Sequence, residues 1–383
     1  MEDIPIRLLL THDLDPRYAW QRLRSFHDTG LTSSQIMASR EIPTDQKDNV
    51  EKQADQIRFC LIQAEEYYKA ASVSNSTTKS LQLYYCAMSL ALAESLWLGD
   101  GTISLDKRAR FHHNHGLDFI FDEGSNDRLE GLAAKPKYHR GEPSGTFGLW
   151  WRHSRNLPFA LDRKIIYTGD RYHNNQVDLG AISNNIFEKD SPLFKLNLLE
   201  CFQNIREMKY ILNKYNHEIR LVRCSASAKT QINHEKREFR NEYKYILHPG
   251  DVNYINKAVE HFSFPPTLVP YVDAAEIKPS GIAIEVSPPA NFNVQYKVPS
   301  GFSTSQNDTF FYSDDHCLNE FGYLYIGLFI CSNLVRYYPH KWMEEIHKSS
   351  KTYVMVDDFM SACVSRLPWL TLSALEDTVF LEK

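Results

Sequence analysis

The sequence has few cysteines and no apolar run of membrane-spanning length. Its seven cysteines are an odd number, stand far apart and include no Cys-x-x-Cys pair. This spacing excludes a disulfide-stapled scaffold and predicts reduced thiols in the core of a cytoplasmic protein. The longest uncharged stretch, from Phe321 to Val335, is shorter than the ~20 residues that cross a bilayer. We expect it to form a buried helix, and we expect no contact with a membrane.

The motifs of several large enzyme classes are also missing. The sequence has no G-x-x-x-x-G-K-[ST], no G-x-G-x-x-G, no G-x-S-x-G and no H-E-x-x-H. Nor does one sign of charge dominate, because 43 Lys and Arg stand against 48 Asp and Glu, for a net charge of -5. A surface made as a whole for polyanions is therefore excluded, and any contact with nucleic acid must be local. No cofactor and no metal ion are predicted.

Helical patterns dominate the N-terminal part of the chain. Asp15 followed by Pro16 predicts the start of a first helix. Residues 51–71 place apolar side chains three and four positions apart, which is typical of an amphipathic helix. Residues 80–99 are apolar on nearly every face, so we expect that helix to be the hub of a bundle.

The middle of the chain has a different texture, with short apolar runs, glycine and proline. This texture predicts strands and loops over 117–190 and 217–313, with helices expected at 193–215 and 251–262. The last segment is helical again. The pattern predicts an α+β fold, in which a helical bundle from the N- and C-terminal segments packs on a β-rich middle region. The expected region boundaries are 1–116, 117–317 and 318–383.

Several segments together resemble the YaaC-like family of bacterial proteins. The resemblance is carried by AEEYYKAAS, TKSLQLYYCAMSLALAESLWL, the His115-Gly116 pair, GTFGLW, LNLLECFQNI and above all YLYIGLFICSNLVRYYPHKW. The resemblance implies a fold, and it implies no particular activity because the family has no settled one. The first two long helices also resemble the start of HEPN bundles, a group of metal-independent ribonucleases and inert or partner-binding relatives. That second resemblance implies a role in phage defence, and a regulatory role is the other cellular setting expected.

The segment RARFHHNHG, residues 108–116, has three interpretations. Arg110 and His115 are separated by four residues, as in HEPN ribonucleases, where histidine moves the 2′-hydroxyl proton and arginine stabilises the phosphorane. The favoured interpretation is structural, with His115 hydrogen-bonded to backbone where the chain turns through Gly116. A metal site at His112, His113 and His115 is the third, although only Asp118 and Asp122 stand nearby as further ligands.

The segment VRYYPHKW holds a second arginine and histidine near a proline. Arg336 and His340 are too close in sequence for the ribonuclease spacing, and Pro339 should end or bend the helix at Tyr338. We expect a helix terminus at which Arg336, His340 and Trp342 lock the bundle together.

Residues 135–171 are the most basic part of the chain. They hold eight Lys and Arg against three acids, whereas the remainder of the chain carries a net charge of -10. Aromatic residues stand between these charges, and cations beside flat rings suit ligands made of phosphates and bases. The opposing interpretation makes Trp150 and Trp151 strand residues, one in the core and one exposed, and the cations a solvated face or partners for acidic helices. The predicted ligand-binding residues are Lys135, Lys137, Arg140, Trp150, Trp151, Arg152 and Arg155.

The sequence thus favours a protein that acts by binding. The predicted partner is a nucleotide or single-stranded nucleic acid at the basic segment, or else a protein, including a second copy in a homodimer. The alternative from another class is a metal-independent endoribonuclease that uses Arg110 and His115.

Overall fold

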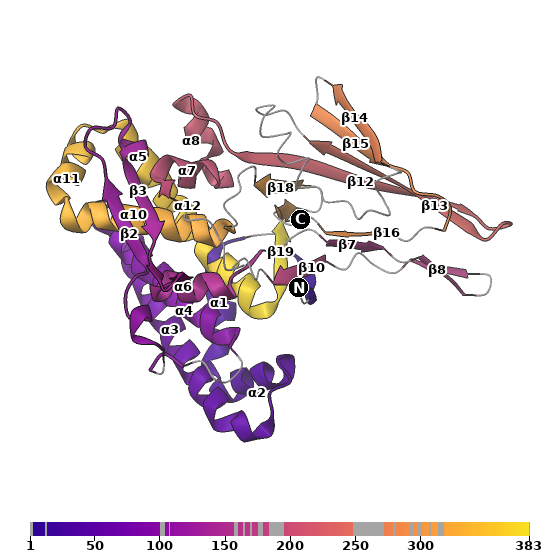
Figure 1. Ribbon diagram of the computed structural model, residues 1–383, viewed down its shortest axis with the longest axis horizontal. Coiled ribbons are helices and arrows are strands. Elements are labelled where there is room, and N and C mark those ends of the chain that lie inside the picture. The colour runs from indigo at the N-terminus through magenta and orange to yellow at the C-terminus, as the bar shows by residue number, and fades with distance from the viewer. Residues whose placement is uncertain are drawn as a thin grey trace.

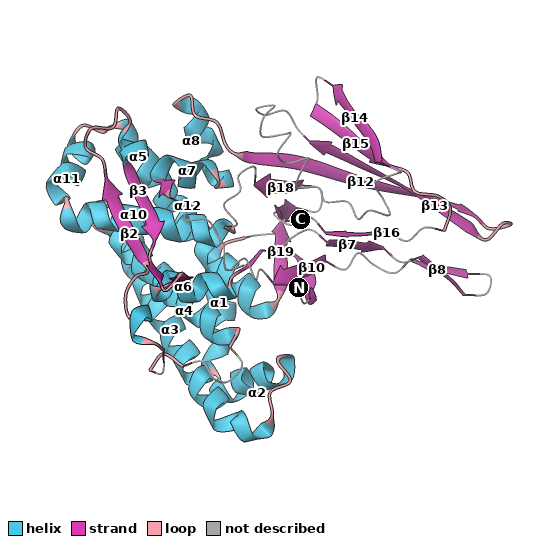
Figure 2. Cartoon of the chain, in the orientation of Figure 1, coloured by secondary structure: helices cyan, strands magenta, loops and turns pink. Residues whose placement is uncertain are grey.

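Helices fill one half of the molecule and long strands the other (Figures 1 and 2). The computed structural model describes residues 3–11, 14–99, 104–106, 108–156, 160–163, 165–168, 171–174, 179–183, 195–247, 272–278, 281–291, 294–297, 301–305, 308–312 and 318–382. The helices are α1 (Pro16–Leu23), α2 (Thr29–Ser39), α3 (Lys47–Val73), α4 (Lys79–Trp97), α5 (Arg128–Gly131), α6 (Gly145–His153), α7 (Leu198–Gln203), α8 (Lys209–Lys214), α10 (Glu320–Tyr337), α11 (Pro339–His347) and α12 (Lys351–Glu376).

The N-terminal helices form as the sequence predicts. The side chain of Asp15 caps α1 by accepting a hydrogen bond from the Arg17 backbone N–H at 2.8 Å, and Pro16 follows at the first helical position. Helices α3 and α4 pack along each other, and α4 also contacts α6, α10 and α12. Most of α4 is buried, so the predicted hub is confirmed.

The C-terminal helices return to this hub. Helix α10 contains the long uncharged stretch, and its residues 320–334 are all buried, as predicted. It ends at Tyr337 and Pro339 opens α11, so the predicted break at the proline is also confirmed. None of the described helices has the length and hydropathy needed to cross a bilayer.

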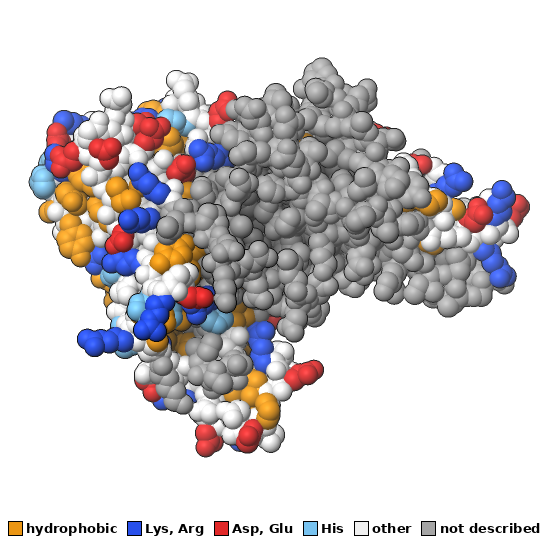
Figure 3. Space-filling model, viewed as in Figure 1, with side chains coloured by type: hydrophobic (Ala, Val, Ile, Leu, Met, Phe, Trp, Pro, Cys, Tyr) orange, Lys and Arg blue, Asp and Glu red, His pale blue; other side chains and the backbone are white. Residues whose placement is uncertain are grey.

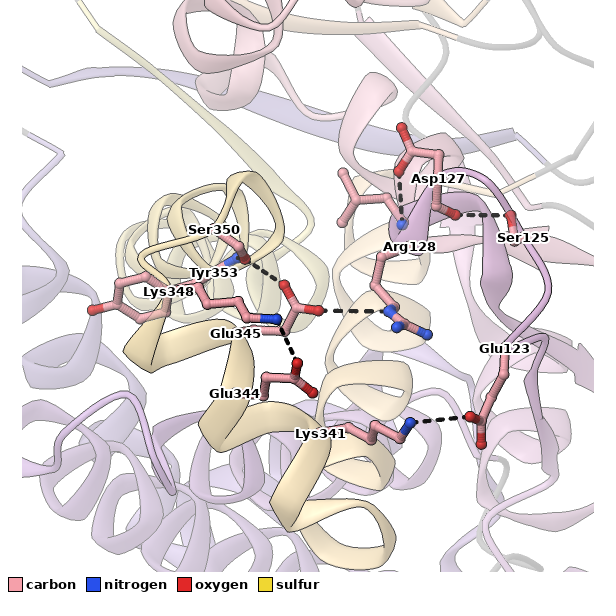
Figure 4. A network of polar contacts seen from close by, with 11 residues as sticks. Glu123, Ser125, Asp127, Arg128, Lys341, Glu344, Glu345, Lys348, Ser350 and Tyr353 are labelled. Carbon is pink, nitrogen blue, oxygen red and sulfur yellow. Dashed lines mark hydrogen bonds and ion pairs between the residues drawn. The ribbon is translucent and has the colours of Figure 1, made fainter.

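Ion pairs attach α11 to the segment between β2 (Leu117–Phe121) and α5 (Figure 4). Lys341 lies 3.1 Å from Glu123 of the loop, and Arg128, the first residue of α5, lies 3.5 Å from Glu345. The network holds this segment against α11.

Ten of the described strands form one sheet, in the order β14-β15-β13-β12-β18-β17-β19-β1-β10-β6. Within this sheet β1 pairs in parallel with β19, from Arg7 opposite Thr378 to Thr11 opposite Glu382. The first and last strands of the chain therefore lie side by side (Figure 1). The strands of this sheet are β1 (Asp3–Thr11), β6 (Arg155–Asn156), β10 (Leu179–Ser183), β12 (Leu221–Asn233), β13 (Glu238–Leu247), β14 (Val272–Lys278), β15 (Gly281–Val286), β17 (Gly301–Ser305), β18 (Asp308–Tyr312) and β19 (Thr378–Glu382).

A second sheet, with the order β11-β3-β2, lies in the helical half. It is made of β2 (Leu117–Phe121), β3 (Leu132–Pro136) and β11 (Leu196–Asn197). The remaining described strands are β4 (Tyr138–His139), β5 (Glu142–Pro143), β7 (Ala160–Arg163), β8 (Ile165–Thr168), β9 (Arg171–Asn174) and β16 (Val294–Lys297). Helices from both chain ends pack together and the middle supplies most of the strands, so the predicted α+β fold is confirmed, with β1 and β19 as strands that the two ends add to the large sheet.

Two local predictions were wrong. Residues 145–153 form the helix α6 and not a strand, because Phe147, Trp150 and Trp151 share one face at helical spacing and bury it. The continuous helix expected at 193–215 is instead β11, α7 and α8. An Asn197–Glu200 capping box starts α7, and the chain turns at Asn204. The helix expected at 251–262 lies outside the described residues.

The described cysteine side chains agree with the reduced-core prediction. They are buried and form no disulfide, and burial raises the pKa of Cys60 to about 12. They are Cys60, Cys86, Cys201, Cys331 and Cys363. The side chain of Cys224, and Cys317, lie outside the described part.

Candidate functional site

The backbone of the histidine segment, residues 108–116, crosses closely over the start of α6. Gly116, with φ +82°, touches Gly145, with φ +70°, so closely that a Cβ on Gly145 would lie 2.2 Å from the Gly116 nitrogen. The Thr146 N–H donates to the Asn114 carbonyl at 2.8 Å, and the Phe147 N–H donates to the His115 carbonyl at 3.1 Å. The start of α6 is thereby fixed to the histidine segment.

An open pocket of about 620 Å³ lies beside this crossing. Its walls come from the histidine segment, from β2 and β3, from the β4–β5 hairpin and from the residue before β11. The lining residues are Phe111, Asn114, Asp118, Lys135, Pro136, Lys137, Tyr138, His139, Ser144 and Lys195.

Strand pairing brings three lysines to the pocket. Because β11 pairs with β3 at Leu196 opposite Ala134, the antiparallel register places Lys195 across from Lys135. Both lysines are exposed, and neither forms an ion pair within the described chain. Lys137 pairs with Asp118 at 3.0 Å. With three lysines and one carboxylate, the lining carries a net charge of about +2 at neutral pH.

The pocket also offers a ring and a hydroxyl group. The exposed His139 ring stacks on Phe111, with centroids 4.6 Å apart and planes 13° from parallel. The hydroxyl oxygen of Tyr138 is buried and has no hydrogen-bond partner among the described residues. Burial raises the pKa of this group, so it remains a neutral donor at physiological pH.

Figure 3 shows lysine and arginine side chains in blue close to histidines in pale blue over this part of the helical half. Arg140 is exposed in the β4–β5 turn, with φ +53°, and Arg152 pairs with Glu142 at 2.5 Å. The side chain of Arg155 lies outside the described residues. Of the predicted ligand-binding side chains, only Lys135 and Lys137 line the pocket.

The expectation that one tryptophan of the Trp150–Trp151 pair is exposed was wrong. Their exposed fractions are 0 % and 2 %. The Trp150 Nε1 donates to the Glu94 carboxylate at 2.9 Å, and its ring lies parallel to that of Tyr325. Both tryptophans are core residues of α6. Trp150 packs against Phe321 and Tyr325 of α10, and Trp151 packs against Phe147.

The three histidines of residues 108–116 lie in different surroundings. His112 is buried and its Nδ1 lies 3.2 Å from the Gly145 carbonyl, whereas His113 is exposed. His115 is half-buried, and its Nδ1 lies 2.9 Å from the Tyr84 hydroxyl. Within the described residues, no three side chains of His, Cys, Asp or Glu come close enough together to hold a metal ion.

The charges around His115 differ from those expected. Arg110 is exposed at the start of a short 3-10 helix (Arg110–His112), and no described contact joins it to His115. Burial lowers the pKa of His115, and the positive charges of Arg336 and Lys137 lower it further. Arg336 donates from Nη1 to the Tyr85 hydroxyl at 3.2 Å. Tertiary structure therefore gives His115 a hydrogen-bond partner in Tyr84 and brings the charge of Arg336, and not that of Arg110, to bear on it.

The predicted lock at the end of α10 is confirmed for two of its three residues. Arg336 holds Tyr85 of α4, and the Trp342 Nε1 donates to the Ser76 carbonyl at 3.0 Å. His340 is exposed.

No sequence pattern pointed to Lys195, Tyr84 or Tyr85 as residues of these sites. Lys195 lies far beyond the basic segment and reaches the pocket only through the pairing of β11 with β3. The two tyrosines stand in an apolar helix, where their spacing gives no sign of a polar partner. Tyr138 is one of the aromatic residues that stand between the charges of residues 135–171, but only the fold buries its hydroxyl.

A protein-family model described as YaaC-like Protein matches residues 24–116 and 179–375. The chain belongs to the YaaC-like family. The match includes Tyr84, Tyr85, His115 and Arg336, and it leaves out 117–178, where most of the pocket lies. Neither the curated proteins nor the solved structures contain a match to this family member.

Proposed function

We propose that this YaaC-like protein acts by binding a nucleotide at the pocket between β3, β11 and the β4–β5 hairpin. The observation that carries the proposal is the pairing of Lys135 with Lys195. Like charges directly across neighbouring strands repel each other, and an anion between them removes that cost. A phosphate group is the anion that best fits the rest of the lining.

The other lining groups suit the remainder of a nucleotide. The exposed face of His139 offers a flat ring on which a base stacks, and Phe111 supports that ring from behind. The Tyr138 hydroxyl lacks a partner and gains one from a sugar or base. The volume of about 620 Å³ lies in the range of small-ligand sites. A nucleotide within a single-stranded nucleic acid presents the same groups, and a regulatory or defence role belongs to this same proposal.

Two substitutions, Lys195→Glu and Tyr138→Phe, should each weaken nucleotide binding without destabilising the protein. Lys195→Glu places a carboxylate across from Lys135, so the free energy of unfolding should rise by roughly 0.2–1 kcal/mol. Nucleotide affinity should fall at least about tenfold, because a phosphate contact becomes repulsive. Calorimetric titration with a mononucleotide and with a single-stranded oligonucleotide, together with urea denaturation, measures both quantities. Lys209→Glu, at an exposed lysine of α8, is the control with the same change of net charge.

Tyr138→Phe removes the buried hydroxyl and leaves the ring in place. Because that hydroxyl has no partner in the free protein, its loss should leave stability unchanged or raise it. The same loss should weaken nucleotide binding by about 1 kcal/mol.

Absence of binding by wild-type protein to either probe at low salt would remove the proposal. Cleavage of the oligonucleotide that is abolished by Arg110→Gln would establish the ribonuclease alternative in its place.

A further inference from the structure

Three of the eight large apolar side chains that are exposed in the described chain lie on α3. They are Phe59, Ile62 and Val73, with exposed fractions of 59 %, 37 % and 87 %. Their spacing places all three on one side of the helix, and the opposite side is buried and packs along α4. One exposed apolar side chain is ordinary, but several along one stripe of a long helix indicate a surface that another molecule covers.

Charged residues on and beside this stripe are arranged about Ile62 with opposite signs. Four residues before Ile62 stands Arg58, and four residues after it stands Glu66. Seven residues before Ile62 stands Asp55, and seven residues after it stands Lys69. All four side chains reach solvent. At both distances from Ile62, therefore, an acid on one side corresponds to a base on the other.

A two-fold axis at Ile62 makes a second copy of α3 complementary to the first. An antiparallel copy places each residue across from the residue that lies equally far on the other side of the axis. Arg58 then faces Glu66 of the second copy, and Asp55 faces Lys69 of the second copy. Each of these contacts joins opposite charges and occurs twice, so the charges favour this arrangement.

Other arrangements of the two helices lack this match. An axis midway between Phe59 and Ile62 places Asp55 across from Glu66, and these two carboxylates repel each other. A parallel pair places every charge across from its own kind. Glu66 forms no ion pair within the described part of its own chain, so the second copy supplies a cation for it.

We infer that α3 is the interface of a homodimer, in which two copies pack antiparallel about a two-fold axis at Ile62. Phe59 and Ile62 form the apolar centre, and the charges on either side set the register. The helix has 27 residues and is therefore about 40 Å long. One helix face of this length buries less than the ~1,200 Å² of a stable interface, so the dimer should form reversibly, at micromolar concentration. No residue of α3 lines the nucleotide pocket, so this inference does not depend on the proposed function.

Sedimentation of the full-length protein over a range of concentrations tests the interface. The wild type should change from monomer to dimer as its concentration rises. Ile62→Glu places two carboxylates next to each other at the axis, so the dissociation constant should rise at least about tenfold. The matched control is Tyr210→Glu, which makes the same change of charge at an exposed apolar residue of α8 and should leave the dimer intact. Both variants should keep the melting temperature of the monomer, because both positions are exposed.

Two outcomes of this experiment overturn the inference. A wild type that stays monomeric well above micromolar concentration would leave the α3 face to a different protein. A dimer that Ile62→Glu does not weaken would use another face of the molecule.

Charge reversal tests the register. Arg58→Glu and Glu66→Arg should each weaken the dimer about tenfold or more, because each places like charges in both symmetry-related contacts. The variant that carries both substitutions restores opposite charges across the axis and should recover most of the affinity. Lys209→Glu, at an exposed lysine of α8, is the control for the change in net charge. If the doubly substituted protein dimerises no more tightly than either single variant, the antiparallel register is wrong.

A cysteine at the axis gives an independent measurement. A disulfide needs two Cα atoms within about 7 Å of each other, so Ile62→Cys should yield a covalent dimer under mild oxidation. Val73→Cys is the control, because Val73 is more exposed but its two copies lie about 33 Å apart in this arrangement. It should give no more covalent dimer than the wild type does. Equal cross-linking of the two variants would reflect random collision and would contradict the interface.

Discussion

At the scale of single residues, burial decides what an aromatic or charged side chain does. Trp150 and His139 both stand in the basic segment. Trp150 is enclosed and bonded to Glu94, whereas His139 lies at the surface, stacked on Phe111. The buried tryptophan therefore stabilises the fold, and the exposed ring is the one available to a ligand.

Trp150→Phe tests this assignment. The substitution leaves a cavity and removes a hydrogen bond to a buried carboxylate, so the free energy of unfolding should fall by roughly 2–4 kcal/mol. Urea denaturation measures the change. His139→Ala, which truncates an exposed ring, should change stability by less than about 0.5 kcal/mol and weaken nucleotide binding. The reverse pattern would make Trp150 a ligand residue.

Glu65 gives a prediction of pH dependence. Two hydrogen bonds from Arg24 lower its pKa to about 2, while burial opposes that shift. Because the pKa in the folded state lies below the value of 4.5 for the free side chain, the stabilisation is present above about pH 4.5 and is lost as the pH falls toward 2. Arg24 is half exposed, so water screens the pair and the contribution is about 1–2 kcal/mol.

Denaturation of wild-type protein and Glu65→Gln across this pH range measures the effect. Their difference in unfolding free energy should shrink as the pH falls. Glu51→Gln, at an exposed position of the same helix, should track the wild type throughout. A pH-independent difference for Glu65→Gln would rule out the titration.

At the scale of elements, the joint between the histidine segment and α6 depends on two glycines. Gly116 and Gly145 both have positive φ; a Cβ on Gly145 would collide with the Gly116 backbone, and a Cβ on Gly116 would lie 2.2 Å from the Ser144 carbonyl oxygen. Neither a strand pattern nor a helix pattern in the sequence marks this crossing. Because of this crossing, the part of the pocket wall formed by Phe111 and Asn114 lies next to Ser144.

Gly145→Ala should therefore be severely destabilising. Its new Cβ would lie 2.2 Å from the Gly116 nitrogen, which forces the two backbone segments apart. Gly141→Ala is the matched control, because Gly141 has φ +84° but nothing within 4 Å of the added Cβ. The control should cost only about 1 kcal/mol for the strained conformation. Thermal denaturation of both variants compares them, and equal losses would show that close approach is unimportant.

The length of an element decided whether the sequence predicted it. Helices α3, α4 and α10 are long, and their patterns repeat over several turns, so local sequence is sufficient to indicate them. Residues 145–153 are too few for the pattern to separate a helix from a buried strand, and packing of Phe147 and Trp150 on α4 and α10 settles the matter. In 193–215 an apolar pattern suggested one helix, but the Asn197 capping box and the turn at Asn204 divide it.

At the scale of the whole molecule, the two ends of the chain complete one structure. Strand β19 lies between β1 and β17, and the Trp369 Nε1 of α12 donates to the Leu14 carbonyl at 2.6 Å. Phe380 packs on Trp369 with ring centroids 5.0 Å apart. We therefore expect each end of the chain to depend on the other for its stability.

Deletion of residues 378–383 should accordingly destabilise the N-terminal helices as well as the sheet. The deletion exposes β1 and removes the buried side chains of Phe380 and Leu381, each of which contributes roughly 1.5–3 kcal/mol. Hydrogen exchange should show loss of protection in β1 and α1. Replacement of the exposed turn 234–237 between β12 and β13 by Asn-Gly is the control, and it should leave protection in α1 unchanged. Unchanged exchange after the deletion would show that the chain ends fold independently.

The sequence by itself determined the α+β class, the long helices, the helix break at Pro339 and the family resemblance, because each follows from local periodicity, turn chemistry or extended similarity. It also indicated the basic segment, through charge that is countable without a fold. Only tertiary structure decided which of those cations share a pocket, since Lys135 meets Lys195 through strand pairing across sixty residues of sequence. The partner of His115 was decided in the same way. Arg110 is near it in sequence, but side chains interact through space, and the fold places the Tyr84 hydroxyl of α4 2.9 Å from the His115 Nδ1.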